Sequence, residues 1–81
     1  MKVSVQFYSY FKDLTGCESV EEELPEPSTI ADLVSCLFKR FPKLAAMKNS
    51  MLIAVGVDYQ PRDYLLKNGD DISLFPPVQG G

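Results

Sequence analysis

The group with the clearest chemical potential in this sequence is the carboxylate of Gly81, at the end of the segment LFPPVQGG. An α-carboxyl group has a pKa of about 3.3–3.7, so it is ionised at neutral pH and is a poor electrophile. It becomes reactive when an enzyme converts it to an acyl-adenylate with ATP. Gly80 and Gly81 have no side chains, so they can enter a channel too narrow for a β-carbon. We therefore predict that Gly81 is a reacting residue that another protein activates.

The residues before the two glycines favour insertion into a partner. Pro76 and Pro77 stiffen the approach, and residues 76–81 reach about 20 Å when extended. Val78 is expected to make a small apolar contact, and Gln79 is polar but uncharged. The absence of charged side chains after the prolines lowers the desolvation penalty of burying this segment. We call residues 76–81 the tail and predict that it is flexible and inserts into a partner.

Other kinds of chemistry find little support. The chain has no histidine, which excludes a Ser-His-Asp triad, a Cys-His pair and a histidine metal ligand. Cys17 and Cys36 are too few for an iron–sulfur cluster and are expected to be free thiols of a reducing compartment. Asp70 and Asp71 are neighbours on a predicted strand and point to opposite faces. We expect no metal site, no bound cofactor and no active site within the domain itself.

Composition and charge restrict the partners. The chain has 81 residues and 46% hydrophobic residues, which fits one globular domain. A net charge of −3 argues against nucleic acid, which needs a basic surface. The longest apolar run, residues 51–57, is too short to span a membrane. Because no basic-then-apolar leader is found, we expect a cytoplasmic protein with no membrane partner.

The charged residues are unevenly distributed. Five glutamates lie within residues 18–26, and four basic residues lie within residues 39–48. One interpretation is two solvated surface patches. The other is electrostatic steering toward a protein partner of complementary charge.

Periodicity predicts the elements that hold the tail. Residues 2–8 and 19–24 alternate between apolar and polar and predict an antiparallel pair of strands. Between them FKDLTG ends in Gly16, a turn or helix-stop position. Thr29 and Asp32 match a capping box, and a helix is predicted from Ile30 to Phe41. Its apolar stripe is Ile30, Leu33, Val34, Leu37, Phe38 and Phe41, and Pro42 stops it.

The second half of the chain reads mainly as strands. Residues 43–49 predict a short helical turn, and residues 51–57 predict a strand buried on both faces. A turn at 58–61, a short edge strand at 63–66 and a last strand at 71–75 follow. The expected fold class is α+β, with one main helix on one face of a four- or five-stranded sheet. Residues 1–75 then form a single domain, and residues 76–81 form the tail.

Strand parity predicts a docking patch beside the tail. Phe75 lies opposite Ile72 and Leu74, so it falls on the face that the helix leaves uncovered. A large exposed aromatic side chain there is expected to anchor a partner. By the same parity Tyr8 lies opposite the buried residues of the first strand, and Tyr59 lies in the turn after the buried strand. We predict that these three residues bind the partner; the alternative is ordinary surface aromatics.

These motifs resemble a known family. The segments F-x-x-L-x-G at 11–16 and L-K-N-G-D-D-I-S-L-F-P-P-V-Q-G-G at 66–81 resemble the sulfur-carrier subunits of molybdopterin synthase, which are ubiquitin-like proteins. The resemblance covers essentially the whole chain. Gly-Gly alone would fit any ubiquitin-like protein, whereas Pro-Pro-Val before it favours this branch. Thiamine-pathway sulfur carriers are similar but shorter, and they typically lack Pro-Pro.

The resemblance implies a β-grasp fold and a function. In that family an adenylating enzyme uses ATP to activate the terminal glycine, here Gly81, and a sulfur donor converts it to a thiocarboxylate. The tail then enters the large synthase subunit, in a heterotetramer of two small and two large subunits, and its sulfur goes to cyclic pyranopterin monophosphate. Phe75 would contact both protein partners. The catalytic lysines belong to the large subunit, so the small subunit alone would not turn over.

Three alternatives remain open from the sequence. The chain resembles the thiamine-type carriers to a lesser degree. It is also compatible with a ubiquitin-like modifier joined to lysines of target proteins, because the activation chemistry is the same. The third alternative is a β-grasp interaction module with an inert tail.

Overall fold

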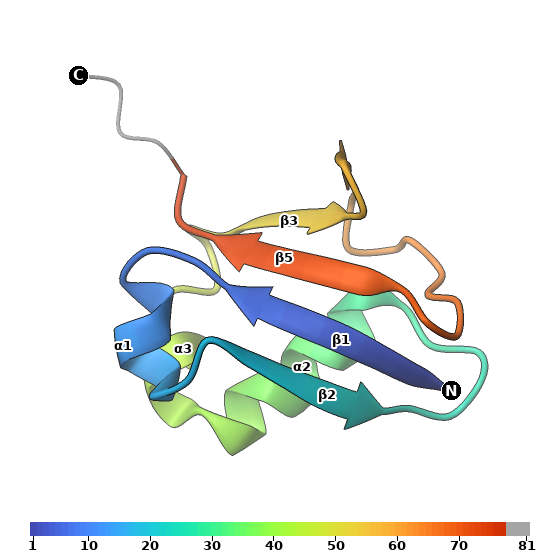
Figure 1. Cartoon of the computed structure of the whole chain (residues 1–81), viewed down its shortest axis with the longest axis horizontal. Coiled ribbons are helices and arrows are strands. Elements are labelled where there is room, and N and C mark those ends of the chain that lie inside the picture. Colours follow the sequence, from blue (N-terminus) through green and yellow to red (C-terminus); the bar gives the residue numbers. More distant parts are fainter. Residues whose placement is uncertain (78–81) are drawn as a thin grey trace.

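A computed structural model describes residues 1–77, which form a five-stranded sheet and three helices. The order is β1 (Lys2–Phe7), α1 (Phe11–Thr15), β2 (Ser19–Glu23), α2 (Ile30–Arg40), α3 (Pro42–Ala45), β3 (Leu52–Val55), β4 (Asp58–Tyr59) and β5 (Asp71–Phe75). The strands lie side by side as β2-β1-β5-β3-β4, with β1 and β5 parallel and the other pairs antiparallel (Figure 1). The predicted α+β class with a mixed sheet is confirmed.

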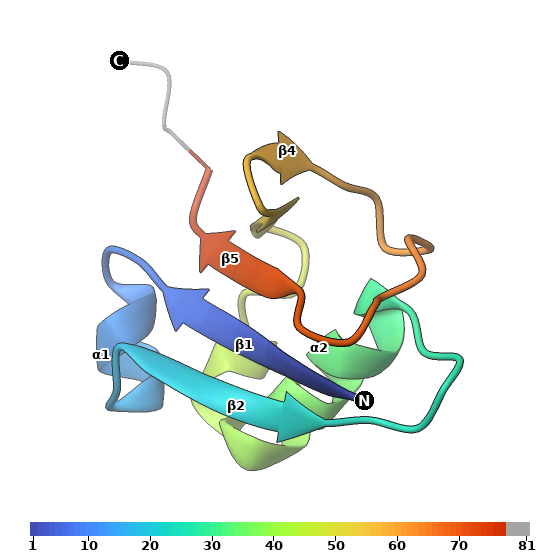
Figure 2. The ribbon, with the colours of Figure 1, turned by 45° about the vertical axis from the view of Figure 1, so that its right-hand side comes forward.

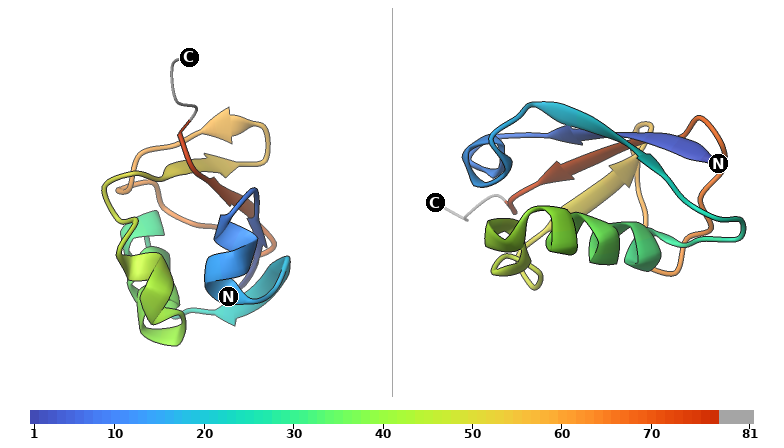
Figure 3. Two further views of the ribbon diagram at one scale, coloured as in Figure 1. Left: turned by 90° about the vertical axis from the view of Figure 1, so that its left-hand side faces the viewer. Right: turned by 90° about the horizontal axis from the view of Figure 1, so that it is seen from below.

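The helix α2 covers one face of the sheet, as the view from below in Figure 3 shows. Alternate residues of the strands point toward it, because successive side chains of a strand face opposite ways. The buried apolar core consists of Val3, Val5, Phe7, Phe11, Leu24, Ile30, Leu33, Val34, Leu37, Leu44, Ile53, Leu66, Ile72 and Leu74. The predicted inward orientation of the apolar residues of β1, α2 and β5 is confirmed.

The start of α2 is fixed by the predicted capping box. The Thr29 hydroxyl accepts a hydrogen bond from the Asp32 amide at 3.3 Å, and the Asp32 carboxylate accepts one from the Thr29 amide at 2.9 Å. A cap of this kind stabilises a helix by about 1 kcal/mol. The helix ends at Arg40, and Pro42 then begins the short helix α3, where its missing amide hydrogen has no consequence.

Three predictions for residues 51–66 are wrong. The edge strand is β4, where a turn was predicted, and residues 63–66 form no strand beyond one isolated bridge from Leu65 to Thr29. The reason is a two-residue turn at Gly56 and Val57, because Gly56 adopts a left-handed φ of 62° and the chain returns at once beside β3 (Figure 2). Val57, predicted to be buried, is 97% exposed at the tip of this hairpin.

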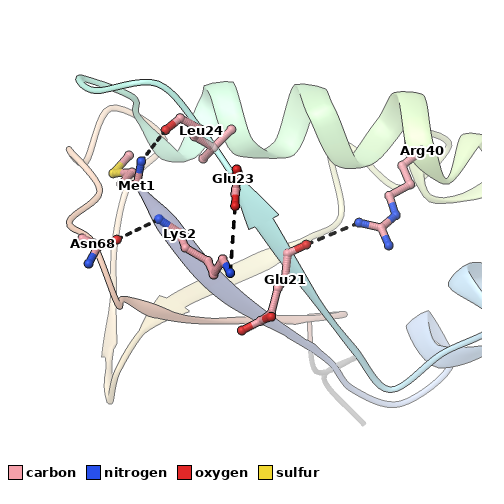
Figure 4. A network of polar contacts seen from close by, with 7 residues as sticks. All are labelled: Met1, Lys2, Glu21, Glu23, Leu24, Arg40 and Asn68. Carbon is pink, nitrogen blue, oxygen red and sulfur yellow. Dashed lines mark hydrogen bonds and ion pairs between the residues drawn. The ribbon is translucent and has the colours of Figure 1, made fainter.

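Polar contacts join the start of β1 to the end of β2 and to the loop at Asn68 (Figure 4). The Met1 ammonium donates to the Leu24 carbonyl at 2.8 Å, and the Lys2 amide donates to Asn68 Oδ1 at 2.8 Å. The Lys2 ammonium lies 3.9 Å from the Glu23 carboxylate, and both side chains are exposed. An exposed ion pair of this kind contributes little to stability. The start of β1 is therefore held mainly by the hydrogen bonds from the backbone nitrogens of Met1 and Lys2.

One ion pair joins α2 to β2. Arg40 Nη1 lies 2.6 Å from the Glu22 carboxylate, and it also donates to the Glu21 carbonyl at 3.4 Å. Glu22 is the more buried partner, whereas half of the Arg40 side chain is exposed.

In the part of the chain that the structure describes, no helix is long and apolar enough to cross a membrane.

A candidate partner-docking face

The predicted aromatic residues all lie on the sheet face that α2 leaves open. Phe75 is half-buried at the end of β5, whereas Ile72 and Leu74 of the same strand are fully buried on the other face. Tyr8 follows β1 directly, and its amide donates to the Leu74 carbonyl at 3.1 Å. Tyr59 lies on β4, rather than in a turn as predicted, opposite Ala54 of β3. Three strands therefore present aromatic rings on one face.

These three rings form a continuous row. The ring centroids of Tyr8 and Phe75 are 6.0 Å apart in an edge-to-face arrangement, and those of Phe75 and Tyr59 are 5.7 Å apart at 51°. Both spacings are in the range of favourable aromatic pairs. Strand parity predicted the open face correctly for Phe75 and Tyr8, whereas Tyr59 reaches it from β4. The role of the three residues in binding a partner stays a prediction.

An open hollow of about 820 Å³ lies along this row. Its lining residues are Tyr8, Ser9, Tyr10, Ala54, Gly56, Val57, Tyr59, Ser73, Phe75, Pro76 and Pro77. None of them is charged, although 23% of the chain is. An uncharged aromatic surface of this kind is typical of the centre of a protein interface.

The base of the tail forms one wall of the hollow. Pro76 and Pro77 are both half-buried and both line it. A protein that fills the hollow would therefore contact the residues from which the tail departs. The predictions for Val78, Gln79, Gly80 and Gly81 concern residues outside those that the structure describes.

The sequence did not predict two residues of this face, Tyr10 and Val57. Ser9, the second residue after β1, adopts a left-handed φ of 56°, and the chain turns there so that Tyr8 and Tyr10 both line the hollow. Few residues other than glycine adopt this conformation, and serine is no specific signal for it. Val57 was missed because it ends an apolar run. The only available signal for it was the preceding Gly56, a favoured first residue of a tight hairpin.

The other candidate groups are dispersed. Within residues 1–77 no cluster of three or more histidine, cysteine or acidic residues could hold a metal ion. Cys17 is half-buried and Cys36 is exposed, and both are free thiols, as predicted. Glu18, Glu21 and Glu23 are exposed at or beside β2, the strand at the opposite edge of the sheet from β4. These glutamates are thus separate from the hollow.

A family model matches nearly the whole chain. The model described as the ThiS family matches residues 5–81. The chain belongs to this family. Curated relatives include the molybdopterin synthase sulfur carrier subunits of Haemophilus influenzae and Homo sapiens. The first is 31% identical over 81 residues, covering 98% of this chain and 99% of the relative. The second is 30% identical over 83 residues, covering 99% of this chain and 94% of the relative. The resemblance to these carriers is confirmed.

Solved structures agree with the fold. SAMP1 from Haloferax volcanii superposes with a TM-score of 0.90 at 18% identity, and all of both chains is covered. A chain in the complex of subunits 1 and 2 of the molybdopterin-converting factor from Helicobacter pylori superposes with a TM-score of 0.73 at 27% identity, again over 100% of both chains. The predicted ubiquitin-like β-grasp fold is confirmed.

Proposed function

We propose that this protein is a sulfur carrier in molybdopterin synthesis and that Gly81 carries the sulfur. The observation that carries the proposal is the position of the uncharged aromatic hollow at the base of a tail that contains Gly80 and Gly81. The similarity to sulfur carrier subunits over nearly the whole chain supports the choice of pathway.

The first step of the proposed cycle is activation. In an adenylating enzyme the Gly81 carboxylate attacks the α-phosphorus of ATP and releases pyrophosphate, which gives an acyl-adenylate. A donor of sulfur at the oxidation level of sulfide then displaces AMP and leaves a thiocarboxylate. The tail suits this step because Gly80 and Gly81 add no side-chain bulk and no side chain after Pro77 is charged.

The second step is delivery. Phe75 anchors the domain on the large synthase subunit, and Tyr8 and Tyr59 flank the anchor. Pro76 and Pro77 direct the tail away from the anchor, and Val78, Gln79 and Gly80 span the channel to the bound cyclic pyranopterin monophosphate. The Helicobacter pylori structure is a complex of subunits 1 and 2 of the molybdopterin-converting factor, which supports a two-subunit arrangement here. We propose a heterotetramer of two small and two large subunits.

In this account the chain supplies a reactive group and does not catalyse. Anchoring raises the effective concentration of the thiocarboxylate at the acceptor, which is the usual benefit of holding two reactants together. The acid–base groups are proposed to come from the large subunit, as the resemblance to this family implies.

Intact-mass measurement tests the proposal. The chain is co-expressed with the adenylating enzyme and the sulfur donor of the same organism. The expected product has one oxygen replaced by one sulfur, and a variant that lacks Gly81 stays unmodified. Unmodified chain only, with enzyme and donor verified as active, would contradict the proposal. High-mass conjugates that disappear when Gly81 is deleted would instead identify a protein modifier.

A further inference from the structure

Three tyrosines surround the hollow, and each is fixed by ring packing. Tyr8 and Tyr59 pack against Phe75 with centroid distances of 6.0 and 5.7 Å. Tyr10 packs edge-to-face on the buried Phe11 at 5.3 Å. Yet Tyr8, Tyr10 and Tyr59 remain 47%, 45% and 65% exposed. Their rings are held in place while a large part of each side chain faces the solvent.

Within residues 1–77 the three hydroxyls make no hydrogen bond to another protein group. Each hydroxyl can donate one hydrogen bond and accept others, and in the free chain water satisfies it. A partner that covers the hollow removes this water. Each hydroxyl that finds no new partner then lowers the affinity, because buried polar groups must be hydrogen-bonded.

The lining also limits the groups that the partner can offer. No charged residue lines the hollow, so a charged group of the partner buried there would lose its hydration without a counter-charge. Neutral polar groups, such as backbone carbonyls and amides, avoid this penalty. Pro76 and Pro77 form one wall of the hollow. The protein that fills the hollow is therefore expected to be the protein that receives the tail.

We infer that Tyr8, Tyr10 and Tyr59, gathered around Phe75 at the base of the tail, are specificity-determining residues whose hydroxyls hydrogen-bond neutral polar groups of the large synthase subunit. The inference rests on the proposed function, since it names the same partner. Phe75 provides apolar burial, and the hydroxyls distinguish a matched partner surface from a merely apolar one. A purely apolar surface would leave the three hydroxyls buried and unsatisfied, which disfavours the wrong partner.

Replacing tyrosine by phenylalanine isolates the hydroxyls. Tyr8→Phe, Tyr10→Phe and Tyr59→Phe are compared singly and combined, by calorimetric titration of the full chain into the purified large synthase subunit of the same organism. The ring contacts persist, and thermal unfolding confirms that the variants fold. Each hydroxyl is expected to contribute about 2- to 12-fold in Kd, the range of a neutral hydrogen bond, and the triple variant more.

Tyr64→Phe is the matched control. Tyr64 lies outside the hollow, with the Lys67 ammonium 5.8 Å from its ring centroid. The Kd of the Tyr64→Phe variant for the large subunit should equal that of the wild type. Unchanged affinity in all three hollow variants, or an equal loss in Tyr64→Phe, would overturn the inference. If Phe75→Ala still weakens binding and Gly81 still accepts sulfur, the proposed function survives that result. If the wild type does not bind the large subunit at all, both fail.

Discussion

Leu74 and Phe75 are neighbours on β5, yet they belong to two different surfaces of the sheet. Leu74 is fully buried in the apolar core on the covered face. Phe75 lies half-buried on the open face, between Tyr8 and Tyr59. The covered face is closed and apolar, and the open face has a neutral hollow at the base of the tail. Alternation along one strand thus separates the residues that stabilise the fold from those proposed to bind partners.

The largest expected effect is on the covered face. Leu74→Ala removes a fully buried side chain and leaves a cavity, so it should lower the free energy of unfolding by about 2–5 kcal/mol. Denaturant titration followed by circular dichroism measures this change. Phe75→Ala, measured in parallel, should lower stability less. Equal destabilisation by the two substitutions would break the distinction between the faces.

The next largest effect is a loss of affinity expected for a substitution on the open face. Phe75→Ala should weaken binding to the large synthase subunit by about tenfold or more, because a central aromatic anchor loses its contact. Calorimetric titration gives the Kd. Leu65→Ala is the matched control, since Leu65 is also apolar and exposed (57%) but lies outside the hollow. A similar loss of affinity in both variants would show that the hollow has no special role.

A smaller effect concerns the helix that covers the sheet. Thr29→Ala removes the hydroxyl that caps α2 and should lower stability by about 1 kcal/mol. Ser35→Ala, at an exposed position within α2, should have little effect or stabilise slightly. Thermal unfolding of the three proteins makes the comparison. Binding to the large subunit should be unchanged in both, and a weaker Kd for Thr29→Ala would mean that α2 also shapes the open face.

The smallest expected effect is that of the ion pair at the β2 edge. Glu22→Gln removes the carboxylate 2.6 Å from Arg40 and should lower stability by at most about 1 kcal/mol, since half of the Arg40 side chain is exposed. The loss should shrink as salt is added. Glu21→Gln is the control, because Glu21 contacts Arg40 through its backbone carbonyl. A loss that does not respond to salt would indicate packing rather than charge.

Much of the covered face could be predicted because its signals are local. The capping box of Thr29 and Asp32 and the apolar spacing after it define α2 without reference to other elements. The alternation of Ile72, Leu74 and Phe75 assigns each residue of β5 to a face. The second pattern also assigned Phe75 to the open face correctly.

The parts that could not be predicted depend on single backbone angles. The apolar run at 51–57 looks like one buried strand, but Gly56 turns the chain and exposes Val57. The left-handed conformation of Ser9 brings Tyr10 to the hollow, and serine carries no specific signal for it. The strand order, with β1 and β5 parallel at the centre, followed from the family resemblance and not from local patterns.

A single-turnover reaction shows whether Gly81 delivers sulfur from the chain docked at its open face. The thiocarboxylated chain is mixed with the large synthase subunit and cyclic pyranopterin monophosphate, and the intact mass of the chain is followed over time. We expect the chain to return to the carboxylate mass as molybdopterin appears. If the chain keeps its sulfur while molybdopterin forms, Gly81 is not the sulfur donor.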